Sequence, residues 1–189
     1  RRTRAPSRPR SAAPLIGPSL PTSPPVDRPR RLAYLGTPDM AVPPLRALHE
    51  AGFEIPLVVS RADTGRGRGG TTAPSPVKAA ALELGIPVTD QVDDLLPLAA
   101  SGEVELGVVV AYGRIIRPHV LDALAMVNVH FSLLPRWRGA APVERAILAG
   151  DEITGVSIMD VEEGLDTGAV YRWGQLRIGV DESAADLRE

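Results

Sequence analysis

The sequence predicts an α/β fold in which a mostly parallel, Rossmann-like sheet carries helices on both faces. From Arg31 onward, short apolar segments alternate with segments of helical periodicity, which is the pattern of parallel strands joined by crossover helices. The 189 residues, 44% of them hydrophobic, suffice for one domain core and not for a second complete domain. We therefore expect a single folded domain over residues 31–189.

Each element follows from a local pattern along the chain. Helix 76–84 has the clearest limits, because Ser75 can cap its start, Pro76 suits the first helical position and Gly85 follows its end. The apolar runs predict strands at 31–36, 55–60, 87–89, 106–111, 127–131 and 155–159, with a last extended segment at 169–178. Helical periodicity predicts helices at 43–51, 76–84, 93–100, 118–125 and 141–149.

Residues 1–30 differ in composition from the rest of the chain. They contain eight prolines and no apolar periodicity, so we expect a disordered tail. Their arginines resemble those of a transit peptide, but the prolines would break the amphipathic helix that such a peptide needs. We therefore expect a cytoplasmic protein, with an organellar location as the alternative. Of the 21 basic residues only Lys78 is Lys, and Ala, Gly and Pro are plentiful, which indicates a bacterium with a GC-rich genome. The chain starts without Met and stops in an apparent first helical turn, so we expect that both ends are cut.

The composition excludes several classes of site. No run approaches the roughly 18 to 20 apolar residues that a membrane helix needs, so we expect no membrane partner. Cysteine is absent and there are only three histidines, which predicts metal-free chemistry. The first 30 residues carry a net charge of +6 and the remainder −8, so any RNA contact needs a local basic patch or sequence beyond this chain.

The end of the first predicted strand argues against a dinucleotide site. Gly36 stands where a dinucleotide-binding fold would begin its G-x-G-x-x-G fingerprint, but the other two glycines are absent. The sequence also has no Walker A motif and no G-x-S-x-G motif. The predicted fold is thus typical of nucleotide binding without the usual nucleotide signature.

Asn128 and His130 are the first candidate catalytic pair. Residues two apart in a strand point to the same face, and both residues lie near the carboxyl end of a predicted strand, where open α/β sheets bind ligands. An amide and an imidazole side by side can stabilise the oxyanion formed when an acyl or formyl carbon is attacked. The alternative is that Asn128 ends a strand and His130 is a buried histidine with satisfied hydrogen bonds.

Asp166 is the second candidate, in the segment Gly164–Gly168. Two glycines bracket this carboxylate, so the turn can bring it close to another part of the chain. If Asp166 meets His130, it would orient the ring and favour the imidazolium. An ordinary acidic turn between strands is the alternative.

Five segments of the chain form a recognisable set of motifs: GTPDMA at 36–41, PSPVK at 74–78, VVVAYGRII at 108–116, NVHFSLLPRWRGAAP at 128–142 and GLDTG at 164–168. In these motifs the sequence resembles the methionyl-tRNA formyltransferase family of folate-dependent formyltransferases. The resemblance runs from about Arg31 to the end of the chain. It implies a Rossmann-like formyltransferase domain over 31–189 and the absence here of the small C-terminal β-barrel domain of that family.

The resemblance also implies a site and its substrates. Asn128, His130 and Asp166 would be the catalytic residues, 10-formyltetrahydrofolate the formyl donor and the α-amino group of methionyl initiator tRNA the acceptor. The folate would be bound by Ser132, Leu133, Leu134 and Pro135 and by Arg114, Ile115 and Ile116. No metal is implied, and we expect a monomer.

The Gly- and Arg-rich segment 61–73 would be a basic loop that meets the tRNA acceptor end. Arg66 and Arg68 are the candidates for phosphate contacts, although the segment ends in GGTTA where bacterial relatives often have lysines. A solvated linker is the alternative.

Other activities remain open from the sequence. Folate formyl enzymes of other kinds share the three catalytic residues: the formyltetrahydrofolate hydrolase domain and the glycinamide ribonucleotide and sugar-nucleotide formyltransferases. A non-catalytic RNA-binding module is the alternative from a different class.

Overall fold

The computed structural model of the protein describes residues 26–65 and 72–188. The tail predicted at 1–30 therefore lies mostly outside the described residues, as do Arg66 and Arg68.

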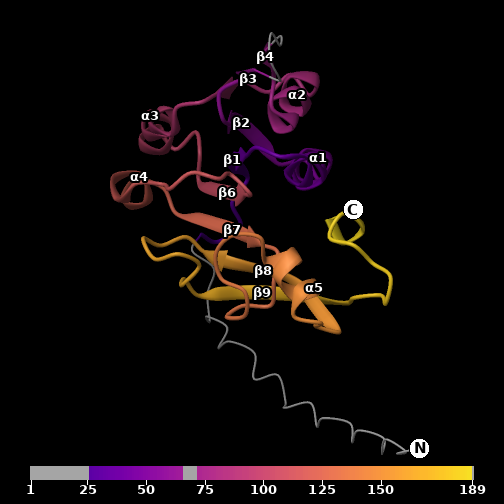
Figure 1. Ribbon diagram of the computed structural model, residues 1–189. Coiled ribbons are helices and arrows are strands. Elements are labelled where there is room, and N and C mark those ends of the chain that lie inside the picture. The colour runs from indigo at the N-terminus through magenta and orange to yellow at the C-terminus, as the bar shows by residue number, and fades with distance from the viewer. Residues whose placement is uncertain (1–25, 66–71, 189) are drawn as a thin grey trace, which may run out of the picture.

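A seven-stranded sheet forms the centre of the described structure (Figure 1). Its strands stand in the order β5-β2-β1-β6-β7-β8-β9. The first five in this order are parallel, whereas β8 pairs antiparallel with β7 and β9 pairs antiparallel with β8. Their bounds are β1 Arg31–Gly36, β2 Glu54–Val59, β5 Val88–Thr89, β6 Leu106–Val110, β7 Met126–His130, β8 Ile153–Asp160 and β9 Val170–Arg177. The predicted α/β class with a mostly parallel sheet is confirmed.

Helices cover both faces of the parallel part of the sheet. Alternate residues of β1 show this, because Leu32 and Tyr34 join one buried cluster while Ala33 and Leu35 join the other. The first cluster includes residues of α1 and α2, and the second includes residues of α3 and α4, on opposite sides in Figure 1. A strand buried on both faces must be apolar throughout, which explains the uninterrupted apolar run of β1. The helices are α1 Val42–Glu50, α2 Pro76–Glu83, α3 Leu95–Ser101, α4 Pro118–Ala123 and α5 Pro142–Leu148.

The start of α2 has the predicted local chemistry. Ser75 adopts an extended conformation, and its hydroxyl oxygen accepts a hydrogen bond from the Lys78 N–H. Pro76 occupies the first turn, where a missing N–H costs nothing. Gly85 follows the end of the helix with a φ of 72°, in the left-handed region that favours glycine.

Four short features of the described structure differ from the sequence prediction: one pair of two-residue strands and three 3₁₀ turns. The segment predicted as a plain loop at 61–73 contains a small antiparallel pair, β3 Thr64–Gly65 with β4 Thr72–Ala73, around the residues that are not described. The helix predicted at 93–100 begins with a 3₁₀ turn, η2 Val92–Asp94. Further 3₁₀ turns are η1 Asp39–Ala41 and η3 Asp186–Arg188. Two-residue strands have no alternation to detect, and 3₁₀ turns have too few residues for a helical period.

Candidate active site

A cavity of about 800 Å³ opens at the carboxyl ends of β6 and β7. Its volume lies within the range of roughly 300 to 1,000 Å³ that is common for small-molecule sites. The walls come from the segment after β6, the end of β7, the loop before α5 and the turn between β8 and β9. The order of the strands along the chain reverses between β1 and β6, because β2 lies on one side of β1 and β6 on the other. Open α/β sheets bind ligands beside such a reversal, at the carboxyl ends of the strands, and Met40, which follows β1, also lines this cavity.

Strand β7 brings Asn128 and His130 to the cavity together. Asn128 is fixed from both sides, because it stands opposite Val109 of β6 and Met159 of β8. His130 is 6% exposed, so its imidazole is almost removed from solvent. Their two-residue spacing places both side chains on the same face of the sheet, as the sequence predicts.

Asp166 reaches the same cavity from the turn between β8 and β9. Its φ is 50°, a left-handed conformation that Asp tolerates better than most residues. Space around this turn is tight: a Cβ atom on Gly164 would overlap the side chain of Thr167, and one on Gly168 would overlap the carbonyl oxygen of Asp160. The two glycines therefore allow the close approach that brings the carboxylate to β7.

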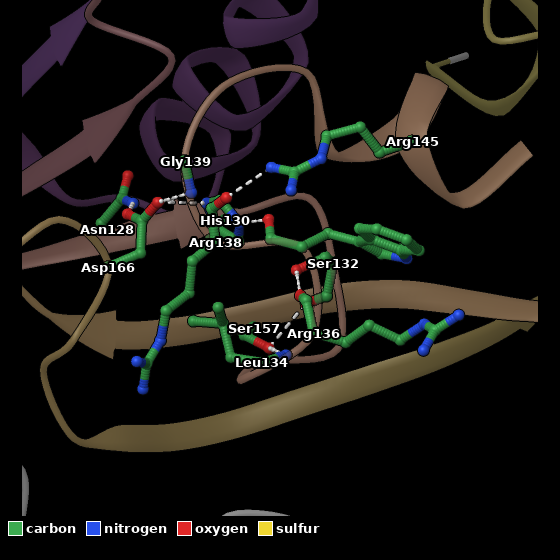
Figure 2. Close-up of polar contacts among 11 residues, drawn as sticks. Asn128, His130, Ser132, Leu134, Arg136, Arg138, Gly139, Arg145, Ser157 and Asp166 are labelled. Atoms are coloured by element: carbon green, nitrogen blue, oxygen red, sulfur yellow. Dashed lines mark hydrogen bonds and ion pairs between the residues drawn. The ribbon is translucent and has the colours of Figure 1, made fainter. Parts of the chain in front are cut away.

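The side chains of Asn128 and His130 converge on the Asp166 carboxylate (Figure 2). Its Oδ2 accepts a hydrogen bond of 2.7 Å from the Gly139 N–H and lies 3.5 Å from Nδ1 of His130. Its Oδ1 lies 3.5 Å from Nδ2 of Asn128. The side chains of His130 and Asp166 are 7% and 13% exposed. The two longer distances exceed those of strong hydrogen bonds, so Nδ2 of Asn128 and Nδ1 of His130 can each interact with a ligand atom that lies between them.

The other nitrogen of His130 is held by the backbone. Its Nε2 lies 3.0 Å from the carbonyl oxygen of Trp137. Because a carbonyl only accepts, Nε2 carries a proton, and Nδ1 is the nitrogen that faces Asp166.

Sequence reasoning missed both backbone contributors to this site, the Trp137 carbonyl and the Gly139 N–H. Backbone groups are common to all residues, so residue type gives no direct signal for them. The available hint was Gly139 itself, whose φ is 82°.

The predicted folate-contacting residues separate into two groups. Arg114, Ile115 and Ile116 line the cavity, and Ile115 is 91% exposed there. In contrast, the segment 132–135 (Ser132, Leu133, Leu134 and Pro135) is not part of the described cavity lining, and both Ser132 and Leu134 are buried. The Ser132 hydroxyl donates a hydrogen bond of 2.6 Å to the carbonyl oxygen of Arg136, which gives it a structural partner. Contact between this segment and folate stays a prediction.

Neither metal nor membrane is indicated by the described part of the chain. Within residues 26–65 and 72–188, no group of three or more His, Cys, Asp or Glu side chains could hold a metal ion. Over the same residues, every helix is too short or too polar to cross a bilayer.

The class of protein to which this chain, with its open α/β sheet and its site, belongs is the formyl transferases. Residues 30–189 match the model of the family described as "Formyl transferase", so the protein belongs to the formyl transferase family. Among curated proteins it is similar to the methionyl-tRNA formyltransferase of Heliobacterium modesticaldum, with 46% identity over 84% of this chain and 52% of that protein. It is 49% identical to the methionyl-tRNA formyltransferase of Roseobacter denitrificans, over 84% of this chain and 54% of that one. The chain spans about half the length of these relatives.

Solved structures share the fold at lower identity. Phosphoribosylglycinamide formyltransferase from Bacillus halodurans superposes with a TM-score of 0.67 at 24% identity, over 83% of this chain and 84% of that one. An N-formyltransferase from Helicobacter canadensis, in complex with folinic acid and dTDP-3-aminofucose, superposes with a TM-score of 0.64 at 21% identity, over 82% of this chain and 56% of that one.

Proposed function

We propose that this chain transfers the formyl group of 10-formyltetrahydrofolate to the α-amino group of methionyl initiator tRNA, in translation initiation. The convergence of Asn128, His130 and Asp166 on one cavity carries the proposal. The choice of acceptor rests on relatives named methionyl-tRNA formyltransferase, which are 42–49% identical over 83–85% of this chain. Structures named for other acceptors are similar at 19–24% identity, which reflects the common fold.

The cavity suits a folate donor beside the three polar side chains. Its volume of about 800 Å³ and its mixture of apolar and polar walls match a drug-sized ligand. In the proposed arrangement, Arg114, Ile115 and Ile116 contact the folate, and the segment 132–135 completes that part of the site. The formyl carbon would lie between Asn128 and His130.

The proposed reaction uses each side chain for a distinct task. The neutral amine attacks the formyl carbon, and the carbonyl oxygen becomes an oxyanion that the Asn128 amide and the Nδ1–H of a doubly protonated His130 stabilise. Asp166 orients the imidazolium and accepts the amine proton through a water molecule. The bond from carbon to the folate nitrogen then breaks, that nitrogen takes the Nδ1 proton of His130, and the proton held by Asp166 passes back to Nδ1.

The tRNA part of the proposal rests on the basic segment that contains Arg66 and Arg68. These two residues would contact acceptor-end phosphates, which position the RNA without taking part in the chemistry. A monomer in the cytoplasm of a bacterium is the form that we propose.

A competition between acceptors tests the proposed function. The full chain is incubated with 10-formyltetrahydrofolate, charged initiator tRNA and glycinamide ribonucleotide, and both formylated products are measured. We expect formyl-methionyl-tRNA alone, with His130→Ala as the inactive control. Formylation of glycinamide ribonucleotide, or release of formate without either product, would instead support one of the other folate formyl enzymes.

A further inference from the structure

The loop before α5 holds two of the backbone groups on which the candidate site depends. The Trp137 carbonyl accepts from Nε2 of His130, and the Gly139 N–H donates to Asp166. This backbone is unusual, because Trp137, Gly139 and Ala141 all have positive φ, at 62°, 82° and 54°. Trp137 and Ala141 are not glycines, so a left-handed conformation persists there only if surrounding contacts enforce it.

Asp151 supplies contacts that enforce it. Its carboxylate accepts from Nε of Arg136 at 2.9 Å and from Nη2 of the same residue at 2.5 Å. It also accepts from the indole Nε1 of Trp137 at 2.7 Å. Asp151 is itself fixed to the end of α5, because its N–H donates to the carbonyl oxygen of Ala146. One carboxylate therefore ties two consecutive side chains of the loop to a helix.

Two arginines complete this cluster around the indole of Trp137. The guanidinium of Arg136 lies 4.5 Å from the centroid of the ring, and that of Arg145 lies 5.2 Å from it, both within cation–π range. Arg145 also donates a hydrogen bond of 2.7 Å to the carbonyl oxygen of Arg138, next in the loop (Figure 2). The residues before and after Trp137 are therefore both held: Arg136 by Asp151, and the Arg138 carbonyl by Arg145.

We propose that Asp151 is a positioning residue for formyl transfer, which acts through Trp137 to hold His130 in one orientation, with Nε2–H bonded to the Trp137 carbonyl and Nδ1 facing Asp166 and the cavity. This inference rests on the proposed function for its kinetic consequence. Within the described residues, the cavity lining includes neither Asp151, Trp137 nor Arg136, so none of them is placed to touch a substrate there. Without the Asp151 carboxylate, the Trp137 backbone is no longer held in the left-handed region. Its carbonyl then moves away from Nε2 and the imidazole loses its fixed direction.

The first test follows the His130 ring directly and needs no substrate. The chain has three histidines, so a ¹⁵N–¹H spectrum of the imidazoles is simple, and a His130→Gln variant assigns the signals of His130. In the full wild-type chain we expect a protonated Nε2 for His130, protected from exchange with water. In Asp151→Ala and Trp137→Phe we expect this proton to exchange faster and the two ring nitrogens to become averaged. Asp151→Asn keeps an acceptor for the indole N–H and should retain the wild-type pattern more closely than Asp151→Ala.

The second test measures turnover. We expect Asp151→Ala to lower kcat by about 10- to 100-fold with KM for both substrates nearly unchanged, since misplacing a catalytic group affects the chemical step. Asp151→Asn should recover part of that loss. Glu105→Gln is the matched control: Glu105 also accepts from an arginine side chain and from two backbone N–H groups, but it precedes the amino end of β6, whereas the cavity lies at the carboxyl ends of the parallel strands. Its replacement should alter stability alone.

The two tests separate failure of this inference from failure of the proposed function. An unchanged His130 spectrum together with unchanged kcat in folded Asp151→Ala would overturn the positioning role. A loss of kcat in Asp151→Ala that merely equals its loss of folded protein, with His130 unaffected, would also overturn it. If the wild-type chain formylated no methionyl-tRNA while the His130 signals still responded to Asp151→Ala, the proposed acceptor would be wrong and the positioning of His130 would stand.

Discussion

The side chains of Asn128, His130 and Asp166 are held in place by the backbone around them, but their contacts with one another are long. Asn128 and His130 each lie 3.5 Å from the Asp166 carboxylate. For Asp166 the short contact is the Gly139 N–H, and for His130 it is the Trp137 carbonyl. The longer approaches are where a substrate atom would enter, because donors that are already saturated have nothing to offer a developing oxyanion.

Removing either proposed oxyanion donor tests this assignment. Asn128→Ala and His130→Ala should each lower turnover by at least about a hundredfold, the usual effect of losing one such donor. Both side chains border a cavity, so folding should be nearly retained. Steady-state kinetics and thermal unfolding on the same preparations give the two quantities. Near wild-type turnover in a folded His130→Ala protein would remove His130 from the mechanism.

Asp166→Asn tests the charge of the third side chain separately from its shape. The amide can still accept from the Gly139 N–H but carries no negative charge toward His130. We therefore expect kcat to fall at least about tenfold while folate affinity changes little. Asp181→Asn, at an exposed position beyond β9, is the control and should be as active as wild type. Full activity of Asp166→Asn would mean that Asp166 is an ordinary turn residue.

The sequence predicted which side chains form the candidate site better than it predicted the backbone groups that hold them. The spacing of Asn128 and His130 is a local property of one strand, and the strand was evident. Asp166 lies 36 residues beyond His130, so their proximity depends on how β8 returns to β7, which no local pattern reports. The Trp137 carbonyl and the role of Asp151 depend on loop conformation and could not be predicted.

Among the elements, strands with apolar runs and the mostly parallel sheet were predictable, but the antiparallel directions of β8 and β9 were not. Within residues 26–65 and 72–188, all seven strands of the main sheet and all five α-helices correspond to predicted segments within a few residues. The antiparallel pairing of β8 and β9 depends on their short connection and on the path of the loop after β7. The β3–β4 pair was missed because two residues on each side give no periodic signal.

The β8–β9 pair offers a test of close packing between elements. A Cβ atom on Gly155 would overlap the carbonyl oxygen of Gly174 and approach Leu133, so Gly155→Ala should lower the free energy of unfolding by about 1 to 3 kcal/mol. An added Cβ on Gly174 meets nothing within 4 Å. Gly174→Ala is thus the matched control and should change stability by at most about 0.5 kcal/mol. Urea unfolding of both variants measures the difference, and equal losses would show that this packing is not limiting.

The link between α5 and the loop before it predicts a pH dependence. The hydrogen bond from Arg136 holds the pKa of Asp151 below its usual range, against desolvation, and the Trp137 indole lowers it further. A carboxyl whose pKa is lowered by folding stabilises the fold fully above its unfolded pKa and loses that contribution as pH falls through its folded value. Wild type should therefore be more stable than Asp151→Asn at neutral pH, with the gap narrowing below about pH 4. Urea unfolding at several pH values measures the gap, and a constant gap would contradict the linkage.

At the scale of the whole molecule, charge is divided unevenly along the chain. Residues 31–189 carry a net charge of −8, whereas the proposed acceptor is a polyanion. Overall attraction therefore cannot bring the RNA to the cavity, and binding must depend on local cations. Arg66 and Arg68, which follow β2 in the sequence, are the local cations that we propose for this role.

Replacing Arg66 and Arg68 together by Ala should weaken binding of initiator tRNA and leave folate affinity unchanged, because phosphate contacts position RNA without touching the donor. For each arginine that binds a phosphate, its replacement should reduce the slope of log affinity against log salt by about 1. Titrations of the full chain with tRNA at several salt concentrations, and separately with tetrahydrofolate, measure both effects. Arg172→Ala with Arg177→Ala is the matched control, since it removes two exposed arginines from β9, an edge strand of the sheet. An equal loss of tRNA affinity in the control would mean that net charge governs binding, and a change in folate affinity in the Arg66 and Arg68 variant would place that segment in the donor site.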